Sequence, residues 1–178
     1  TIIEETIGYR TVTGRRIFAS NMDLRGNLQK NNAPATPDKT GIYRADALCQ
    51  TWAENAGSTG HWRALLSDER HAAKHRLRYD GDYYNMRGEF ITNTLFPASG
   101  TLSQAVEYDE DGGSINSDRK VITGTQLDGL SHGPDCSSYT QIIGSSAIGE
   151  PFSTTTSWLY DSASSCSNLY SLYCINAQ

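Results

Sequence analysis

Apolar residues recur at helical spacing in one early part of the chain. Between residues 42 and 53 they are three or four positions apart, which gathers them on a single face of a helix. The members of this face are Ile42, Ala45, Leu48, Cys49, Trp52 and Ala53. Gly57 follows as a typical helix terminator. The pattern predicts an amphipathic helix that packs against a core.

Strict alternation replaces the helical period just after this helix. Residues 60–67 are expected to form a strand with Trp62, Ala64 and Leu66 on one side. Residues 68–78 are then predicted to form a second, shorter helix. Its candidate N-terminal caps are Ser67 and Asp68.

The second half of the chain contains three further strand patterns. Strands are expected at 121–125, at 141–144 and at 168–175, the last of which closes the fold. Its two predicted faces are Leu172 with Cys174 and Tyr173 with Ile175.

The remaining segments are extended or irregular. Residues 1–7 and 9–13 are strand-like, and residues 17–20 form a short buried strand. Residues 21–40 have the composition of a long loop. Residues 80–113 show little periodicity, which indicates an extended loop with short pieces of strand.

Length and charge narrow the organisation and the class of partner. The chain of 178 residues fits one core, so we expect a main domain at 16–178, with 1–15 as a strand or connector from an upstream stalk. The net charge of −5 argues against a general nucleic-acid binder. No apolar run approaches the roughly 20 residues of a transmembrane helix, so no membrane insertion is expected.

Cysteine usage indicates an oxidising compartment. The sequence contains four widely spaced cysteines and no C-x-x-C pair. Two disulfides are therefore more plausible than a zinc ribbon or a redox motif. Spacing alone leaves all three connectivities open. The cysteines are Cys49, Cys136, Cys166 and Cys174.

Several motifs resemble, in order, the endostatin-like domains at the C-termini of certain collagens. The matching segments are 45–49 (ADALC), 60–68 (GHWRALLSD), Gly124-Thr125, Gly129, Cys136, Ser165-Cys166 and 170–175 (YSLYCI). The resemblance covers about residues 16–175. It implies an α+β fold of the C-type-lectin-like class: a mixed, mostly antiparallel twisted sheet with two helices and long loops. It also implies two nested disulfides, Cys49–Cys174 and Cys136–Cys166.

Departures from lectins of that class bear on calcium. Where calcium-dependent sugar-binding lectins have Glu-Pro-Asn, this chain has Glu150-Pro151-Phe152, and Phe152 has no oxygen ligand. We therefore expect no cofactor, and calcium has no supporting motif. The zinc-binding histidines near the N-terminus of collagen endostatins are also missing, since the first histidine is His61.

Two other features are candidates for ion binding. Asp109, Glu110 and Asp111 have oxygen ligands suited to calcium, but a plain surface turn is the more typical use of such residues. His71 and His75 are four residues apart and would share a helix face, a spacing found in zinc sites. The arginines and lysine around them favour a solvated basic helix instead.

The most suggestive binding feature is a tyrosine-rich loop at 79–85. Rigid aromatic rings combined with carboxylates and amides are typical of binding loops, because rings stack on apolar faces while polar groups bond to hydroxyls. The predicted ligand-binding residues are Tyr79, Asp80, Asp82, Tyr83, Tyr84, Asn85 and Trp158. Tyr108, Tyr139 and Tyr160 are possible additions to the same surface.

These patterns favour a binding domain over an enzyme. We expect a secreted or cell-surface recognition domain for glycans or another cell-surface ligand. Its display at the tip of a homotrimeric fibre or adhesin is suggested by the resemblance, because endostatin-like heads in collagens follow a trimerising segment. The alternatives are a carbohydrate-active enzyme on the same fold and a purely structural fibre cap. No catalytic residues are assigned.

Overall fold

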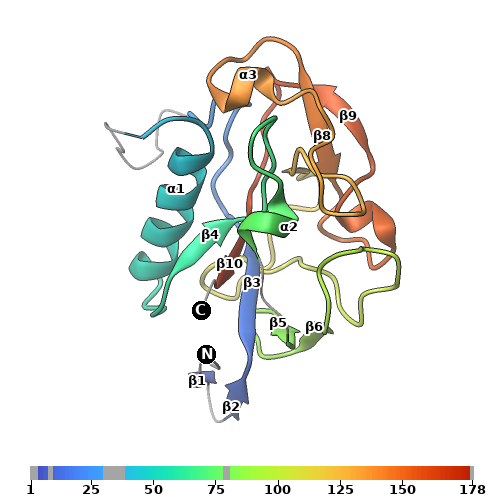
Figure 1. Ribbon diagram of the computed structural model, residues 1–178. Helices are drawn as coiled ribbons and strands as arrows, with labels where there is room; N and C mark the ends of the chain where they lie inside the picture. Colours follow the sequence, from blue (N-terminus) through green and yellow to red (C-terminus); the bar gives the residue numbers. More distant parts are fainter. Residues whose placement is uncertain (1–3, 8–9, 30–38, 78–80, 177–178) are drawn as a thin grey trace.

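The computed structural model of the chain describes residues 4–7, 10–29, 39–77 and 81–176. A five-stranded sheet lies at its centre, in the order β4-β10-β3-β5-β6 (Figure 1). The bounds are β3 Arg15–Ala19, β4 Trp62–Ala64, β5 Tyr83–Tyr84, β6 Phe90–Thr92 and β10 Tyr173–Asn176. The β3–β5 pair is parallel and the other pairs are antiparallel, so the sheet is mixed and mostly antiparallel, as predicted.

The last strand, β10, separates two hydrophobic clusters. Leu172 and Cys174 belong to the cluster that also contains the buried face of the long helix. Tyr173 and Ile175 belong to the second cluster, on the other side of the sheet. The two predicted faces of the closing strand are therefore confirmed, but its predicted extent of 168–175 is wrong, because the strand begins only at Tyr173. Burial on both faces removes much apolar surface of this strand from water.

The long helix α1, Gly41–Asn55, confirms the helical pattern around residues 42–53. Its buried residues include every member of the predicted apolar face. The helix lies beside β4 and covers one side of the sheet (Figure 1). A disulfide between Cys49 and Cys174 joins it to β10, and a second joins Cys136 to Cys166. The two nested disulfides are thus as the resemblance implied.

A second, three-stranded sheet has the order β7-β8-β9. Its strands are β7 Val121–Ile122, β8 Ser145–Gly149 and β9 Ser162–Ser165. The strand predicted at 141–144 is wrong, because residues 141–144 form a loop and β8 begins only at Ser145. Gly144 has a φ of +93°, which is incompatible with an extended strand at this position. The preceding residue, Ile143, is exposed in the loop.

The described part of the chain holds three α-helices and one 3-10 helix, and all of them except α1 are short. The short helices are α2 Ala73–Arg76, α3 Cys136–Tyr139 and η1 Thr156–Trp158. The predicted helix at 68–78 is wrong in extent, since only four residues of it are helical. Asp68 accepts hydrogen bonds from the amides of Arg70 and His71, which stabilises a tight turn in place of a first helical turn.

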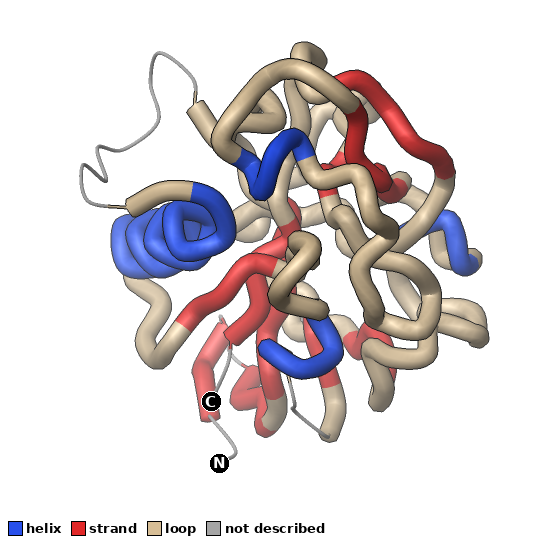
Figure 2. Tube along the Cα trace, turned by 45° about the horizontal axis from the view of Figure 1, so that its top comes forward, coloured by secondary structure: helices blue, strands red, loops and turns tan. Residues whose placement is uncertain are grey.

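The N-terminal strands pair with each other as a separate two-stranded sheet. Strand β1, Glu4–Ile7, runs antiparallel to β2, Arg10–Thr13, and the chain then enters β3. Loops form much of the rest of the described trace, especially between β6 and β7 (Figure 2). The fold is therefore α+β with mixed sheets, few helices, long loops and two disulfides, as the sequence predicted at that level.

Candidate functional site

The tyrosine-rich loop does not form the predicted stacking surface. Tyr79 and Asp80 lie outside the described residues. Asp82 is exposed, but the Tyr83 side chain is completely buried in the second hydrophobic cluster. Asn85 is buried too, where its Oδ1 accepts from the Glu89 amide at 3.0 Å. Tyr83 and Asn85 are therefore structural, which corrects their prediction as ligand contacts.

Two more predicted aromatic contacts have structural roles. Trp158 is 1% exposed and packs on Tyr173, with ring centroids 5.5 Å apart, so it offers no ring face to a ligand. Tyr84 is half-buried and meets the ring of Phe90 edge-on at 5.8 Å. The aromatic residues predicted to form one binding surface therefore do not do so. Trp158 lies in the core, and Tyr84 packs on a neighbouring ring.

The acidic loop uses its carboxylates internally. Asp109 is buried, and its Oδ1 accepts from the amides of Asp111 at 3.0 Å and Gly113 at 2.8 Å. Glu110 accepts from the Asn21 amide at 3.0 Å, and burial raises the pKa of its carboxyl. In the described ranges, no group of three or more His, Cys, Asp or Glu side chains could hold a metal ion. The turn interpretation of this loop accounts for these bonds.

His71 and His75 do not share a helix face. His71 precedes α2, whereas His75 lies within it and is exposed. The helical spacing that suggested a zinc pair is therefore absent. His71 has a different partner, described next.

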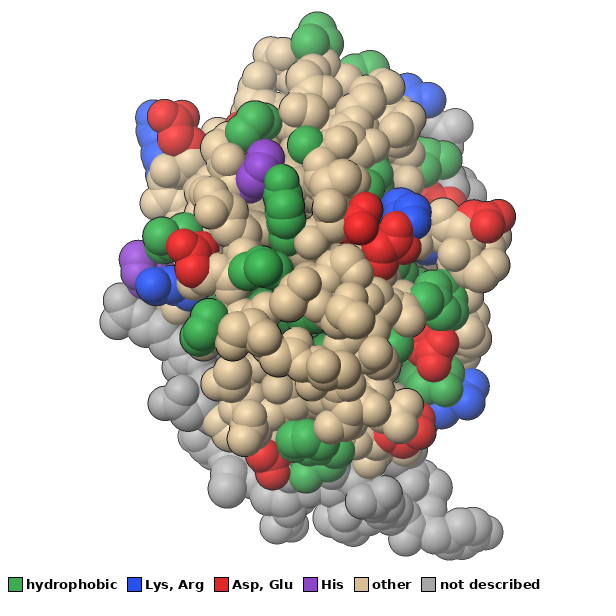
Figure 3. Space-filling view, turned by 90° about the vertical axis from the view of Figure 1, so that its right-hand side faces the viewer, with side chains coloured by type: hydrophobic (Ala, Val, Ile, Leu, Met, Phe, Trp, Pro, Cys, Tyr) green, Lys and Arg blue, Asp and Glu red, His purple; other side chains and the backbone are tan. Residues whose placement is uncertain are grey.

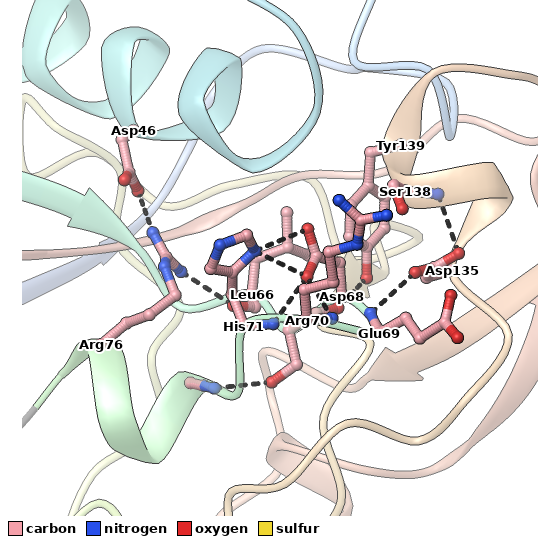
Figure 4. A network of polar contacts seen from close by, with 12 residues as sticks. Asp46, Leu66, Asp68, Glu69, Arg70, His71, Arg76, Asp135, Ser138 and Tyr139 are labelled. Carbon is pink, nitrogen blue, oxygen red and sulfur yellow. Dashed lines mark hydrogen bonds and ion pairs between the residues drawn. The ribbon is translucent and has the colours of Figure 1, made fainter.

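An Asp–His pair lies in the loop between β4 and α2. His71 Nδ1 lies 2.9 Å from Asp68 Oδ1, and the same carboxylate accepts from the His71 amide at 2.7 Å (Figure 4). A carboxylate only accepts, so in neutral His71 the proton is on Nδ1 and Nε2 is the acceptor. The Asp68 side chain is 7% exposed and that of His71 is 37% exposed. The buried carboxylate therefore fixes the imidazole on its Nδ1 side, while the rest of the ring is accessible from solvent.

Exposed side chains surround this pair. The ring of Tyr43, from the first turn of α1, meets His71 edge-on with centroids 5.9 Å apart and is 61% exposed. Glu69 and Arg70 are exposed, and neither side chain makes a polar contact with any residue that the structure describes. We call Tyr43, Glu69, Arg70 and His71 the loop–helix surface. It combines one aromatic ring with donors and acceptors of both charges.

Strained backbone supports this surface from one side. All four residues of α3, Cys136–Tyr139, have φ values between 54° and 59°, so α3 is a left-handed turn. L-residues avoid this conformation at a cost of roughly 1–2 kcal/mol each, and such strain tends to collect at functional sites. Asp135 stabilises the turn, since its Oδ1 accepts from the Ser138 amide and its Oδ2 from the Glu69 amide.

A buried hydroxyl anchors the turn of α3 to the same loop. Tyr139 Oη donates to the Ser67 carbonyl oxygen at 2.6 Å (Figure 4). Burial raises the pKa of Tyr139 well above its ordinary value, so the hydroxyl stays protonated and remains a donor. The Cys136–Cys166 disulfide fixes the other end of the turn.

A partly buried ion pair holds the opposite side of the loop. Arg76 pairs with Asp46 of α1, and its Nη1 donates to the carbonyls of Leu66 at 2.8 Å and Ala64 at 3.0 Å. The loop that carries His71 is thus fixed to α1, β4 and α3 together. Among these residues the sequence singled out His71 as a metal candidate, and Asp68 only as a cap. The spacing Asp-x-x-His was the available signal.

Comparisons with known proteins add no relative. No protein-family model matches the chain, and a search of curated proteins finds no match. Among the described residues, no helix has the length and apolar composition needed to cross a bilayer. What the fold defines is an α+β protein whose two disulfides are typical of an oxidising compartment.

Proposed function

We propose that this chain is an extracytoplasmic recognition domain that binds a glycan or another cell-surface ligand and does not catalyse a reaction. One observation carries the proposal. The loop–helix surface presents free polar and aromatic side chains on a backbone that is fixed from three sides. A rigid base lowers the entropy lost on binding, which is how preorganised sites gain affinity.

The chemistry of the surface suits a polar ligand with hydroxyl groups. The exposed ring of Tyr43 offers an apolar face, and His71 Nε2 accepts a hydrogen bond when the ring is neutral. Arg70 and Glu69 supply free donors and acceptors at the rim. This mixture is typical of binding surfaces that recognise polar partners through a few aromatic anchors.

The fold proposal is the endostatin-like branch of the C-type-lectin-like class. Its support is the ordered set of motifs, the nested disulfides and a last strand that is tied to the first long helix. Display as a homotrimeric fibre tip or adhesin is part of the same proposal. The separate β1–β2 hairpin, which leads into β3, fits a chain that arrives from a stalk.

Binding assays on glycans and on whole cells test the proposal. Wild-type protein is compared with Tyr43→Ala and His71→Ala on a glycan array and on intact cells. His61→Ala is the matched control, because His61 is exposed and lies outside the loop–helix surface. We expect at least about tenfold weaker binding for both site variants, the loss of about 1.4 kcal/mol of contact energy. Unchanged binding by folded site variants would falsify the assignment of this surface.

A carbohydrate-active enzyme is the second candidate, and the Asp68–His71 pair favours it. In many enzymes a carboxylate orients an imidazole, and the imidazole acts as the general base; Asp68 and His71 have this arrangement. This alternative predicts slow cleavage of a bound glycan, detected by mass spectrometry of the products. Cleavage by wild-type protein that Asp68→Asn reduces would establish it in place of simple recognition.

A further inference from the structure

Uncharged atoms occupy most of one face of the molecule. Figure 3 shows this face, on which backbone and uncharged side chains predominate, while acidic and basic side chains lie mainly towards the margins, with one acidic and basic group to the right of the centre. The sequence explains the pattern, because no lysine or arginine follows Lys120. The acidic residues after that point are Asp128, Asp135, Glu150 and Asp161. Three of these carboxylates are already occupied, since Glu150 pairs with Lys120 and both Asp128 and Asp135 accept from backbone amides.

An aromatic pair lies within this C-terminal part of the chain. Tyr160 and His132 are both partly exposed, and their rings are 5.0 Å apart with planes tilted by only 34°. Tyr160 Oη and His132 Nε2 are hydrogen-bonded at 3.1 Å, which fixes the two rings relative to each other. Together they form a compact aromatic patch of two tilted rings, which we call the Tyr160 surface.

The burial of one ring nitrogen of His132 is energetically unfavourable. Its Nδ1 is buried and has no hydrogen-bond partner in the structure, although the ring itself is partly exposed. A buried polar atom without a partner destabilises the fold, so such groups are uncommon. An imidazole held in this way beside an exposed tyrosine indicates that ring placement matters more here than complete satisfaction of its nitrogens.

Residues with hydroxyl groups flank Tyr160 along the chain. The Tyr160 amide donates to the Thr156 carbonyl and so closes the turn of η1. On that turn, the hydroxyls of Ser153, Thr155 and Ser157 contact one another at 2.8–3.0 Å. On the other side of Tyr160, β9 carries Ser162 and Ser164, both partly exposed. An aromatic face flanked along the chain by residues with hydroxyls matches the apolar faces and hydroxyl groups of a sugar.

We infer that the Tyr160 surface binds an uncharged saccharide, whose ring stacks on Tyr160 and His132. This inference rests on the proposed recognition function. It adds a second binding surface, distinct from the loop–helix surface, and names uncharged saccharides as the ligands of that second surface. Anionic sugars are disfavoured because the residue that follows Tyr160, Asp161, is an exposed carboxylate. Asp161 accepts instead from hydroxyl donors, as it does from Ser162 Oγ at 3.1 Å.

The test uses whole protein with two panels of oligosaccharides. One panel contains neutral gluco-, manno-, galacto- and N-acetylglucosamine oligomers, and the other contains sulfated and uronate-bearing oligomers. Binding is measured by saturation-transfer NMR and by calorimetry for wild type, Tyr160→Ala, Tyr160→Phe and His132→Ala. Tyr43→Ala is included to report on the loop–helix surface separately. Phe90→Ala is the matched control, because it removes an exposed aromatic ring that belongs to neither surface. Near-ultraviolet circular dichroism checks that each variant is folded.

We expect wild type to bind members of the neutral panel and Tyr160→Ala to bind them at least about tenfold more weakly. Tyr160→Phe keeps the ring and is expected to lose much less. Amide shifts in wild-type spectra should concentrate around Tyr160 and β9, a readout that needs no variant. If Tyr43→Ala alone weakens saccharide binding, the inference is overturned while the proposed function stands. Binding of anionic sugars only, or of no saccharide, also overturns it.

Discussion

The hydroxyl of Tyr139 donates a hydrogen bond to the carbonyl oxygen of Ser67, 2.6 Å away and 72 residues earlier in the chain. Both residues are buried, so neither group can exchange this partner for water. The bond joins the left-handed turn of α3 to the loop that carries Asp68 and His71. It therefore links the strained backbone to the loop–helix surface.

Removing that hydroxyl should lower the free energy of unfolding. Tyr139→Phe leaves the buried Ser67 carbonyl without this donor, and an unsatisfied buried group costs about 1–3 kcal/mol. Urea denaturation at neutral pH measures the effect. Tyr43→Phe is the control, since the exposed Tyr43 should change stability by less than about 0.5 kcal/mol. Equal stability of the two variants would contradict this role for Tyr139.

The same contact explains an intolerant glycine. Gly124 has a φ of +57°, and a Cβ at this position would overlap both Tyr139 Oη and the Ser67 carbonyl oxygen. Gly124→Ala should therefore destabilise the protein by more than about 4 kcal/mol or prevent folding. Gly57→Ala isolates the backbone effect, because Gly57 has a φ of +81° with open space around it. Its expected cost is about 1–2 kcal/mol, measured by thermal denaturation.

The elements with the clearest periodicity were predictable from the sequence, whereas the strand at 141–144 and most of the helix at 68–78 were not found. The helix around residues 42–53 and the two faces of the strand near Cys174 were confirmed because their periodicity is clear. The loops that form the candidate sites have no period. Asp68 was recognised as a capping residue, but its actual partners, the amides of Arg70 and His71 and the His71 ring, form a turn.

Burial of single aromatic residues was the least predictable feature. Tyr83 and Trp158 lie in polar stretches of sequence, yet both are core residues. What buries them is packing against distant segments, such as that of Trp158 on Tyr173 of β10. Such contacts between distant segments cannot be predicted from local composition. The left-handed α3 also has no sequence pattern, since four successive non-glycine residues adopt positive φ only under tertiary constraint.

The two disulfides should stabilise the fold unequally. Cys49 and Cys174 are 125 residues apart, whereas Cys136 and Cys166 are 30 apart. In the chain-entropy view, removing the longer cross-link costs about 5 kcal/mol and removing the shorter about 3.6 kcal/mol, as upper limits. Double alanine replacement of each pair, followed by urea denaturation, measures both. A larger loss for the shorter cross-link would show that native contacts, and not loop entropy, dominate.

Glu110 should destabilise the fold at neutral pH. Desolvation by burial raises the pKa of its carboxyl, although the Asn21 amide opposes the shift. A raised pKa in the folded state means that the folded protein binds this proton more tightly than the unfolded chain. The cost is therefore fully present above the folded pKa and disappears as pH falls through it to below the unfolded value of about 4.3.

Glu110→Gln removes that cost and keeps an acceptor for the Asn21 amide. We expect a higher melting temperature than wild type at pH 7, with a difference that shrinks steadily as pH is lowered towards 4. Differential scanning calorimetry across this range is the measurement. Glu69→Gln controls for the loss of one negative charge at an exposed position. A difference that grows on acidification would reverse the sign and refute this account.

Arg76 should contribute more to stability than its partner Asp46. Its guanidinium pairs with Asp46 and donates to the carbonyls of Leu66 and Ala64, so its removal takes a donor from two backbone carbonyls and the counter-charge from Asp46. Arg76→Met should cost about 1–3 kcal/mol, the range for leaving hydrogen-bond acceptors of this kind without their donor. Asp46→Asn should cost less, because asparagine still accepts from the Ala64 amide. Arg76→Lys should not rescue the loss, since an ammonium cannot reproduce the planar set of donors. A double-mutant cycle by urea denaturation separates the pair energy from the carbonyl contacts, and additive losses would show that the ion pair itself contributes nothing.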